Sequence, residues 1–195
     1  AELVLTPGRP GMQGAVDRAC QLQQEIPGSF IPHQFDNTAN AAVHYRTSGP
    51  EIWRDTGGRL DFLVAGVGTG GTISGGGRFL KEQNPQMRVV AVEPVDSPVL
   101  SGGSPGPHLI EGIGAGFVPS IYADDIVDEV VRVSNDDAIA TTKQLAKTEG
   151  MLAGISAGAN VFAARQIASD PANAGKRVVT IICDTGERYL STGFV

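Results

Sequence analysis

The feature that most limits how this chain can fold is an apolar run followed at once by a glycine-rich turn. Residues 60–66 read LDFLVAG, which predicts a buried strand, and residues 72–83 have the spacing of a helix. The turn between them reads GVGTGGT over residues 66–72. A strand, a tight glycine turn and a helix in that order are typical of α/β proteins.

The same alternation continues through the rest of the chain and predicts an α/β fold. Further strands are expected at residues 1–6, 29–35, 87–93, 126–133 and 177–183. Further helices are expected at residues 11–25, 38–55, 135–149 and 157–168. Alternating strands and helices favour a mostly parallel sheet with flanking helices. A change of pattern near residue 36 predicts a smaller domain over 1–35 and a larger one over 36–195.

Local signals fix the ends of one predicted helix. Ser134 is followed three residues later by Asp137, a capping pattern that begins the helix. Gly150 is the expected left-handed residue after its last turn.

Composition excludes several classes of protein. With 15 basic and 21 acidic side chains the net charge is −6, which disfavours nucleic-acid binding. No apolar run approaches the roughly 18 residues of a membrane span, and no leader precedes the body of the chain, so a cytoplasmic protein is expected. The chain begins without Met, and both ends are expected to lie inside a longer polypeptide.

Cysteines and histidines do not indicate a metal or redox site. Cys20 and Cys183 lack CxxC spacing and are expected to be buried free thiols in a reducing compartment. The three histidines, His33, His44 and His108, have no partner at metal-ligand spacing and are expected to be structural. No metal site is predicted.

The glycine turn is the strongest candidate site. Backbone N–H groups at the start of the following helix are free to bind an anion, and the helix dipole favours one there. The expected anion-binding residues are Gly68, Thr69, Gly70, Gly71 and Thr72. A phosphate is the natural ligand for such a turn.

The nature of the phosphate stays open on spacing alone. Gly66, Gly68 and Gly71 also match the dinucleotide fingerprint, and Glu93 ends the next strand, where a ribose-binding acid would lie. Against this, a dinucleotide fold usually begins with that unit, whereas earlier elements precede it here. No GK[ST] follows, which excludes a nucleoside-triphosphate loop.

Two polar motifs remain. The stretch GISAG (154–158) spells a hydrolase nucleophile elbow, but no histidine follows Ser156, which is more simply the N-cap of the 157–168 helix. The stretch DTGERYLST (184–192) follows the last strand, where α/β proteins bind ligands. Spacing alone does not separate a binding loop from a plain polar turn there.

Read together, these stretches resemble the cysteine synthases, also called O-acetylserine sulfhydrylases. These are pyridoxal-phosphate enzymes of fold type II, with a tryptophan synthase β-like fold. The resemblance extends in order over HQFDNTANAAVHYRTSGPEIW (33–53), GVGTGGTISG (66–75), VAVEPVDSPVL (90–100), GPHLIEGIGAGFVP (106–119), EGMLAGISAGA (149–159) and DTGERYLST (184–192).

The resemblance implies roles for particular residues. It assigns the turn from Gly68 to Thr72 to the 5′-phosphate of pyridoxal 5′-phosphate, in place of a dinucleotide. It assigns Thr185 to the pyridine nitrogen, where a hydroxyl leaves the ring a milder electron sink that suits β-elimination. It assigns Gln34 to the substrate carboxylate. The residues that it assigns to the mouth of the active site are Gly112, Ile113 and Gly114.

The chain departs from the family pattern in two places. The family's Schiff-base lysine and a substrate-carboxylate loop precede the part that matches this chain. The lysines here are Lys81, Lys143, Lys147 and Lys176, and none has the matching context, so no catalytic residue is predicted within the chain. We therefore expect the C-terminal two-thirds of the enzyme, incomplete at the N-terminus and inactive alone. The second departure, Thr38 in place of proline, is expected to affect only a turn.

The implied reaction is the synthesis of L-cysteine from O-acetylserine and sulfide. The family also implies a homodimer and a partner, the C-terminal tail of serine acetyltransferase. Alternatives left open are a cystathionine β-synthase, an O-phosphoserine-type sulfhydrylase and a non-catalytic binding module.

Overall fold

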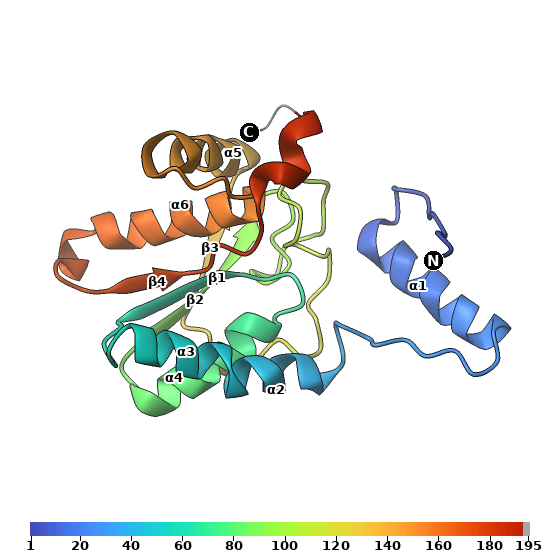
Figure 1. The fold of residues 1–195 in the computed structure, drawn as a ribbon, viewed down its shortest axis with the longest axis horizontal. Helices are drawn as coiled ribbons and strands as arrows, with labels where there is room; N and C mark the ends of the chain where they lie inside the picture. The colour runs from blue at the N-terminus through green and yellow to red at the C-terminus, as the bar shows by residue number, and fades with distance from the viewer. Residues whose placement is uncertain (193–195) are drawn as a thin grey trace.

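The fold is built on a four-stranded parallel sheet (Figure 1). The computed structural model describes residues 1–192. The strand order is β3 (Glu129–Val133), β2 (Arg88–Pro94), β1 (Phe62–Gly66) and β4 (Val178–Thr180). Val64 of the central strand β1 pairs with Val90 on one side and Thr180 on the other, and every pairing is parallel. The predicted α/β fold is confirmed.

Helices cover both faces of this sheet (Figure 1). The helices α2 (Thr38–Arg46), α3 (Ser48–Asp55) and α4 (Gly77–Gln83) lie on one side, and α5 (Asn135–Gln144) and α6 (Ile155–Ser169) lie on the other. Alternate side chains of a strand point to opposite faces. Leu63 therefore joins the core beneath α3 and α4, whereas Val64 joins the core beneath α6.

Shorter helical segments connect these elements. A π-helical turn, η1 (Thr72–Gly76), runs directly into α4, so the helix predicted over 72–83 is confirmed with a wider first turn. The remaining short segments are η2 (Asp124–Ile126), η3 (Leu145–Glu149), η4 (Pro171–Asn173) and η5 (Gly186–Thr192).

The predicted ends of the 135–149 helix are confirmed. The Ser134 hydroxyl accepts a hydrogen bond of 3.1 Å from the backbone N–H of Asp137. Gly150 is left-handed, with φ of +69°. Between these ends α5 continues into η3, and helix α1 (Gly11–Glu25) likewise begins and ends as predicted.

Two predicted strands are wrong. Residues 1–6 and 29–35 have no strand structure, because no strand lies beside either segment among the described residues. Pro32 has no N–H to donate, and His33 adopts a positive φ of 50° that begins a turn. The backbone N–H groups of Asp36 and Asn37 both donate to the His33 carbonyl.

The N-terminal segment is set apart from the sheet (Figure 1). No residue of α1 is buried, and an extended stretch leads from it to α2. The division into domains 1–35 and 36–195 stays a prediction. None of the helices within residues 1–192 is long and apolar enough to cross a membrane.

Candidate active site

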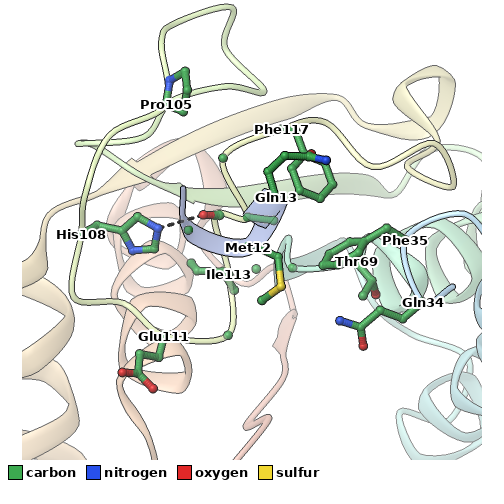
Figure 2. Close-up of a pocket in the computed structure, with 18 of the residues that line it drawn as sticks. Met12, Gln13, Gln34, Phe35, Thr69, Pro105, His108, Glu111, Ile113 and Phe117 are labelled. Carbon is green, nitrogen blue, oxygen red and sulfur yellow. Dashed lines mark hydrogen bonds between the residues drawn. The ribbon is translucent and has the colours of Figure 1, made fainter. Parts of the chain in front are cut away.

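A cavity of about 1390 Å³ opens beyond the carboxyl end of β1. Figure 2 shows Thr69, Gln34 and Phe35 on one side of it, and His108 and Glu111 on the other. Met12 of α1 lies between these groups. The residues that line the cavity come from segments far apart in the sequence: 8–13, 34–35, 65–66, 68–72, 105–108, 111–117, Asn160, Ile181 and Cys183. The carboxyl ends of parallel strands are where α/β folds bind ligands.

The glycine turn provides a row of free donors in this cavity. Among residues 1–192, the backbone N–H groups of Gly68, Thr69 and Gly70 have no hydrogen-bond acceptor. All five predicted anion-binding residues, 68–72, line the cavity, and the helix formed by η1 and α4 begins there. Free N–H groups at a helix start, with the positive end of its dipole behind them, fit an anion such as phosphate.

Both threonine hydroxyls of the turn are held by side chains of α2. Thr69 Oγ1 accepts from Asn40 Nδ2 at 3.0 Å. Thr72 Oγ1 lies 3.2 Å from His44 Nε2, and His44 Nδ1 lies 2.8 Å from the Ser48 hydroxyl. Burial lowers the pKa of His44, which favours its neutral form beside the turn. His44 was expected to be structural, and the structure places it directly behind the anion site.

A second glycine loop faces the first. The N–H of Gly114 donates to the carbonyl of Val67 at 2.9 Å, which ties residues 112–116 to the end of β1. His108 Nε2 donates to the Gly114 carbonyl at 2.9 Å, the dashed line in Figure 2. A Cβ on Gly68 would overlap the carbonyl oxygen of Gly112. The two loops therefore approach more closely than side chains allow. The structure brings the predicted mouth residues Gly112, Ile113 and Gly114 into the cavity lining.

Two predicted residues lie at different distances from the cavity. Gln34 is exposed and lines it, and its role at the substrate carboxylate stays a prediction. Thr185 is exposed and does not line it; its Oγ1 accepts from the N–H of Glu187 at 3.3 Å. From the same segment, Ile181 and Cys183 do line the cavity. A role for Thr185 at the pyridine nitrogen stays a prediction.

The prediction that Ser156 caps α6 is wrong. Gly154 is the N-cap, because its extended backbone precedes the helix and its carbonyl accepts the N–H of Gly158. Ser156 lies inside the helix, buried, with its hydroxyl 3.2 Å from Cys183 Sγ. Ser156 therefore has a thiol and not a histidine as its partner, which removes the basis of the hydrolase hypothesis.

The two cysteines are less buried than expected. Cys183 is exposed as a residue, although its thiol faces Ser156, and Cys20 is half-buried. Partial burial of the Cys183 thiol raises its pKa. A raised pKa leaves the thiol protonated at neutral pH and is typical of a structural group, not a nucleophile.

Glu93 is not available to bind a ribose. It is 1% exposed, and its carboxylate accepts the N–H groups of Leu100 and Ser101 at 2.7 and 3.1 Å, and the Ser101 hydroxyl at 2.5 Å. These bonds anchor the loop that follows β2. Glu93 therefore cannot serve as the ribose-binding acid, and the dinucleotide interpretation is not supported.

Asn160 is a buried polar residue in the cavity that sequence reasoning missed. Asn160 is 2% exposed, and its Nδ2 donates to the Ile181 carbonyl at 2.9 Å. Its Oδ1 has no donor among residues 1–192. Asn160 lies four residues after Ser156 and so on the same face of α6, a spacing that would have pointed to it. A buried acceptor without a partner at a cavity indicates that a ligand completes the site.

Within the described residues, the cavity contains neither a cluster of metal ligands nor a lysine. Within residues 1–192, no cluster of His, Cys, Asp and Glu could hold a metal ion. None of the chain's lysines lines the cavity. Lys81 pairs with Asp128 at 2.8 Å, and Lys176 Nζ lies over the Phe62 ring.

Comparison with known proteins identifies the family. A family model described as "pyridoxal-phosphate dependent enzyme" matches residues 1–184. The chain belongs to this family. It is 51% identical over 193 residues to the cysteine synthase of Staphylococcus aureus, covering 98% of this chain. It spans 62% of the length of that relative.

Solved structures of this family have the same fold. Cysteine synthase from Entamoeba histolytica superposes with a TM-score of 0.93 at 43% identity, over 100% of this chain and 57% of that one. The O-acetylserine dependent cystathionine β-synthase from Helicobacter pylori superposes with a TM-score of 0.90 at 40% identity, over 98% of this chain and 62% of that one. Fold type II is thereby confirmed, and the cofactor of the family is pyridoxal phosphate.

The residues present fit this cofactor. Its phosphate is an anion that accepts several hydrogen bonds, and the turn offers three free N–H groups at a helix start. The cavity is larger than a small cofactor alone requires, and leaves room for a substrate beside it. The unpartnered Oδ1 of Asn160 is a further sign of a ligand at the same place.

Proposed function

We propose that the protein containing this chain is a cysteine synthase, which forms L-cysteine from O-acetyl-L-serine and sulfide with pyridoxal phosphate as cofactor. The observation that carries the proposal is the row of free N–H groups at Gly68, Thr69 and Gly70 in a cavity that Gln34 also lines. The 51% identity to a cysteine synthase supports the same reaction.

The chain's part in this reaction is binding and orientation. The N–H groups of Gly68, Thr69 and Gly70, with the hydroxyls of Thr69 and Thr72, would hold the phosphate. Gln34 would meet the substrate carboxylate, and residues 112–114 would line the mouth of the active site. When bound, the cofactor would supply the electron sink that takes up the electrons of the substrate's Cα–H bond and so allows the leaving group to depart from the β-carbon. The bond from that carbon to the acetate oxygen breaks, acetate leaves, and the sulfur of sulfide bonds to the same carbon without net oxidation.

On this proposal, the lysine that forms the covalent bond to the cofactor lies in another part of the protein. No lysine of the described chain lines the cavity, and the relatives are longer than the part matched. We infer that the Schiff-base lysine belongs to a segment outside these 195 residues. The 195-residue chain alone would then bind the cofactor's phosphate without completing the reaction.

Further properties are inferred from the family resemblance alone. They are a cytoplasmic location, a homodimeric state and binding of the C-terminal tail of serine acetyltransferase. They add no step to the chemistry above.

The assay that tests the function uses the complete encoded protein with pyridoxal phosphate. We expect cysteine to form from O-acetylserine and sulfide, with acetate released in equal amount. Homocysteine in place of sulfide tests for a cystathionine β-synthase, and O-phosphoserine in place of O-acetylserine tests for the other sulfhydrylase. Turnover with homocysteine or O-phosphoserine but none with O-acetylserine and sulfide would overturn the proposal.

A further inference from the structure

Asn40 connects two parts of the cavity that are far apart in the sequence. It lies in the first turn of α2, half-buried, and its Nδ2 donates to the Gln34 carbonyl at 2.9 Å and to Thr69 Oγ1 at 3.0 Å. A backbone carbonyl can only accept, so the nitrogen of the amide must face Gln34. The two hydrogens of one NH₂ group thus serve the Gln34 segment and the glycine turn together.

The amide of Asn40 also contacts the turn on its oxygen side. A Cβ on Gly71 would overlap Asn40 Oδ1, so the oxygen packs directly against the backbone of the turn. Asn40 is therefore held from both sides, by its hydrogen bonds at the nitrogen and by contact at the oxygen. Its orientation is a fixed property of the site.

This fixed donor determines what the Thr69 hydroxyl can do. A hydroxyl has two lone pairs and one proton. Thr69 Oγ1 accepts from Asn40 Nδ2 and, at 3.3 Å, from the N–H of Gly71, which uses both lone pairs. Its proton has no acceptor among residues 1–192, and Thr69 lines the cavity. The hydroxyl is left as a donor toward an anion in the cavity.

We propose that Asn40 is a positioning residue for the cofactor phosphate: it holds the Thr69 hydroxyl as a dedicated donor and ties the Gln34 segment to the phosphate turn. This rests on the proposed function, in which the turn binds that phosphate. Asn40 itself does not line the cavity and acts through Thr69.

The test compares pyridoxal phosphate with pyridoxal, which lacks the phosphate, as ligands of the complete encoded protein freed of cofactor. In Asn40→Ala we expect the affinity for pyridoxal phosphate to fall about tenfold, the effect of one hydrogen bond to a charged group. The affinity for pyridoxal should stay unchanged. The ³¹P resonance of the bound phosphate should shift in the same variant.

A double-variant cycle separates positioning from a general structural role. If Asn40 acts through Thr69, Asn40→Ala combined with Thr69→Val should bind pyridoxal phosphate no more weakly than Thr69→Val alone. Asn84→Ala is the matched control, because Asn84 Nδ2 also donates to a backbone carbonyl, that of Leu60, away from the cavity. Asn84→Ala should leave the preference for the phosphate unchanged.

The possible failures can be told apart. Equal losses for pyridoxal phosphate and pyridoxal in Asn40→Ala, or additive losses in the double variant, would overturn the role of Asn40 alone. If the unmodified protein binds pyridoxal as tightly as pyridoxal phosphate, the turn at 68–72 does not bind the phosphate. The proposed phosphate site and the role of Asn40 would then both be wrong.

Discussion

Gly68→Ala is expected to reduce cysteine formation by the complete protein about a hundredfold, the effect of displacing a bound group by about 1 Å. The new Cβ would overlap the carbonyl oxygen of Gly112 and come within 3.4 Å of its carbonyl carbon. Both are backbone atoms, so the overlap cannot be relieved by rotation of a side chain. The two glycine loops must separate, and the free N–H groups of residues 68–70 move with them. The measurement is the rate of cysteine formation at saturating cofactor.

A control for this variant lies in the same cavity. Gly8 also lines the cavity, and a Cβ there would have no atom within 4 Å. Gly8→Ala should keep nearly full activity. Full activity in Gly68→Ala would mean that the close approach of the two loops is not needed to bind the cofactor.

Gly75→Ala is expected to lower the free energy of unfolding by about 3 kcal/mol, the upper part of the range for overpacking a core. Gly75 lies in η1, directly against α2. Its Cβ would overlap the carbonyl oxygen of Ala41 and lie 2.8 Å from the backbone nitrogen of Tyr45. Relief of this overlap requires α2 and η1 to move apart. Denaturant unfolding of the complete protein measures the change.

The neighbouring glycine is a matched control. Gly76 is also buried in η1, but a Cβ there would come no closer than 4.0 Å to another group, the Gly49 nitrogen. Because alanine favours a helix over glycine by about 1 kcal/mol, Gly76→Ala should leave stability unchanged or raise it. Equal destabilisation by both variants would contradict the packing of α2 on η1.

The parts of this fold that follow from local sequence were predicted, because their causes lie within a few residues. Ser134 caps a helix three residues away, and the glycine turn at 66–72 lies between its own strand and helix. The strands expected at 1–6 and 29–35 depend on a distant partner strand, which local pattern does not reveal. Pro32, which has no backbone N–H to donate to a neighbouring strand, counts against the second of these predicted strands.

For the candidate site, the sequence indicated continuous stretches of chain, whose roles stay predictions. The turn at 68–72 was picked out by its own pattern and the loop at 112–114 by the family resemblance, and both line the cavity. Asn40 reaches Thr69 across 29 positions, and Asn160 reaches Ile181 across 21. Contacts of that range come from the tertiary fold, so no spacing rule of one segment could have found both partners.

The central claim is that the turn at 68–72 binds the phosphate of pyridoxal phosphate. A crystal structure of the complete encoded protein with this cofactor tests it most directly. We predict the phosphate within hydrogen-bond distance of the N–H groups of Gly68, Thr69 and Gly70 and of the Thr69 hydroxyl. A cofactor whose phosphate lies elsewhere, with these N–H groups bound only to water, would contradict the claim.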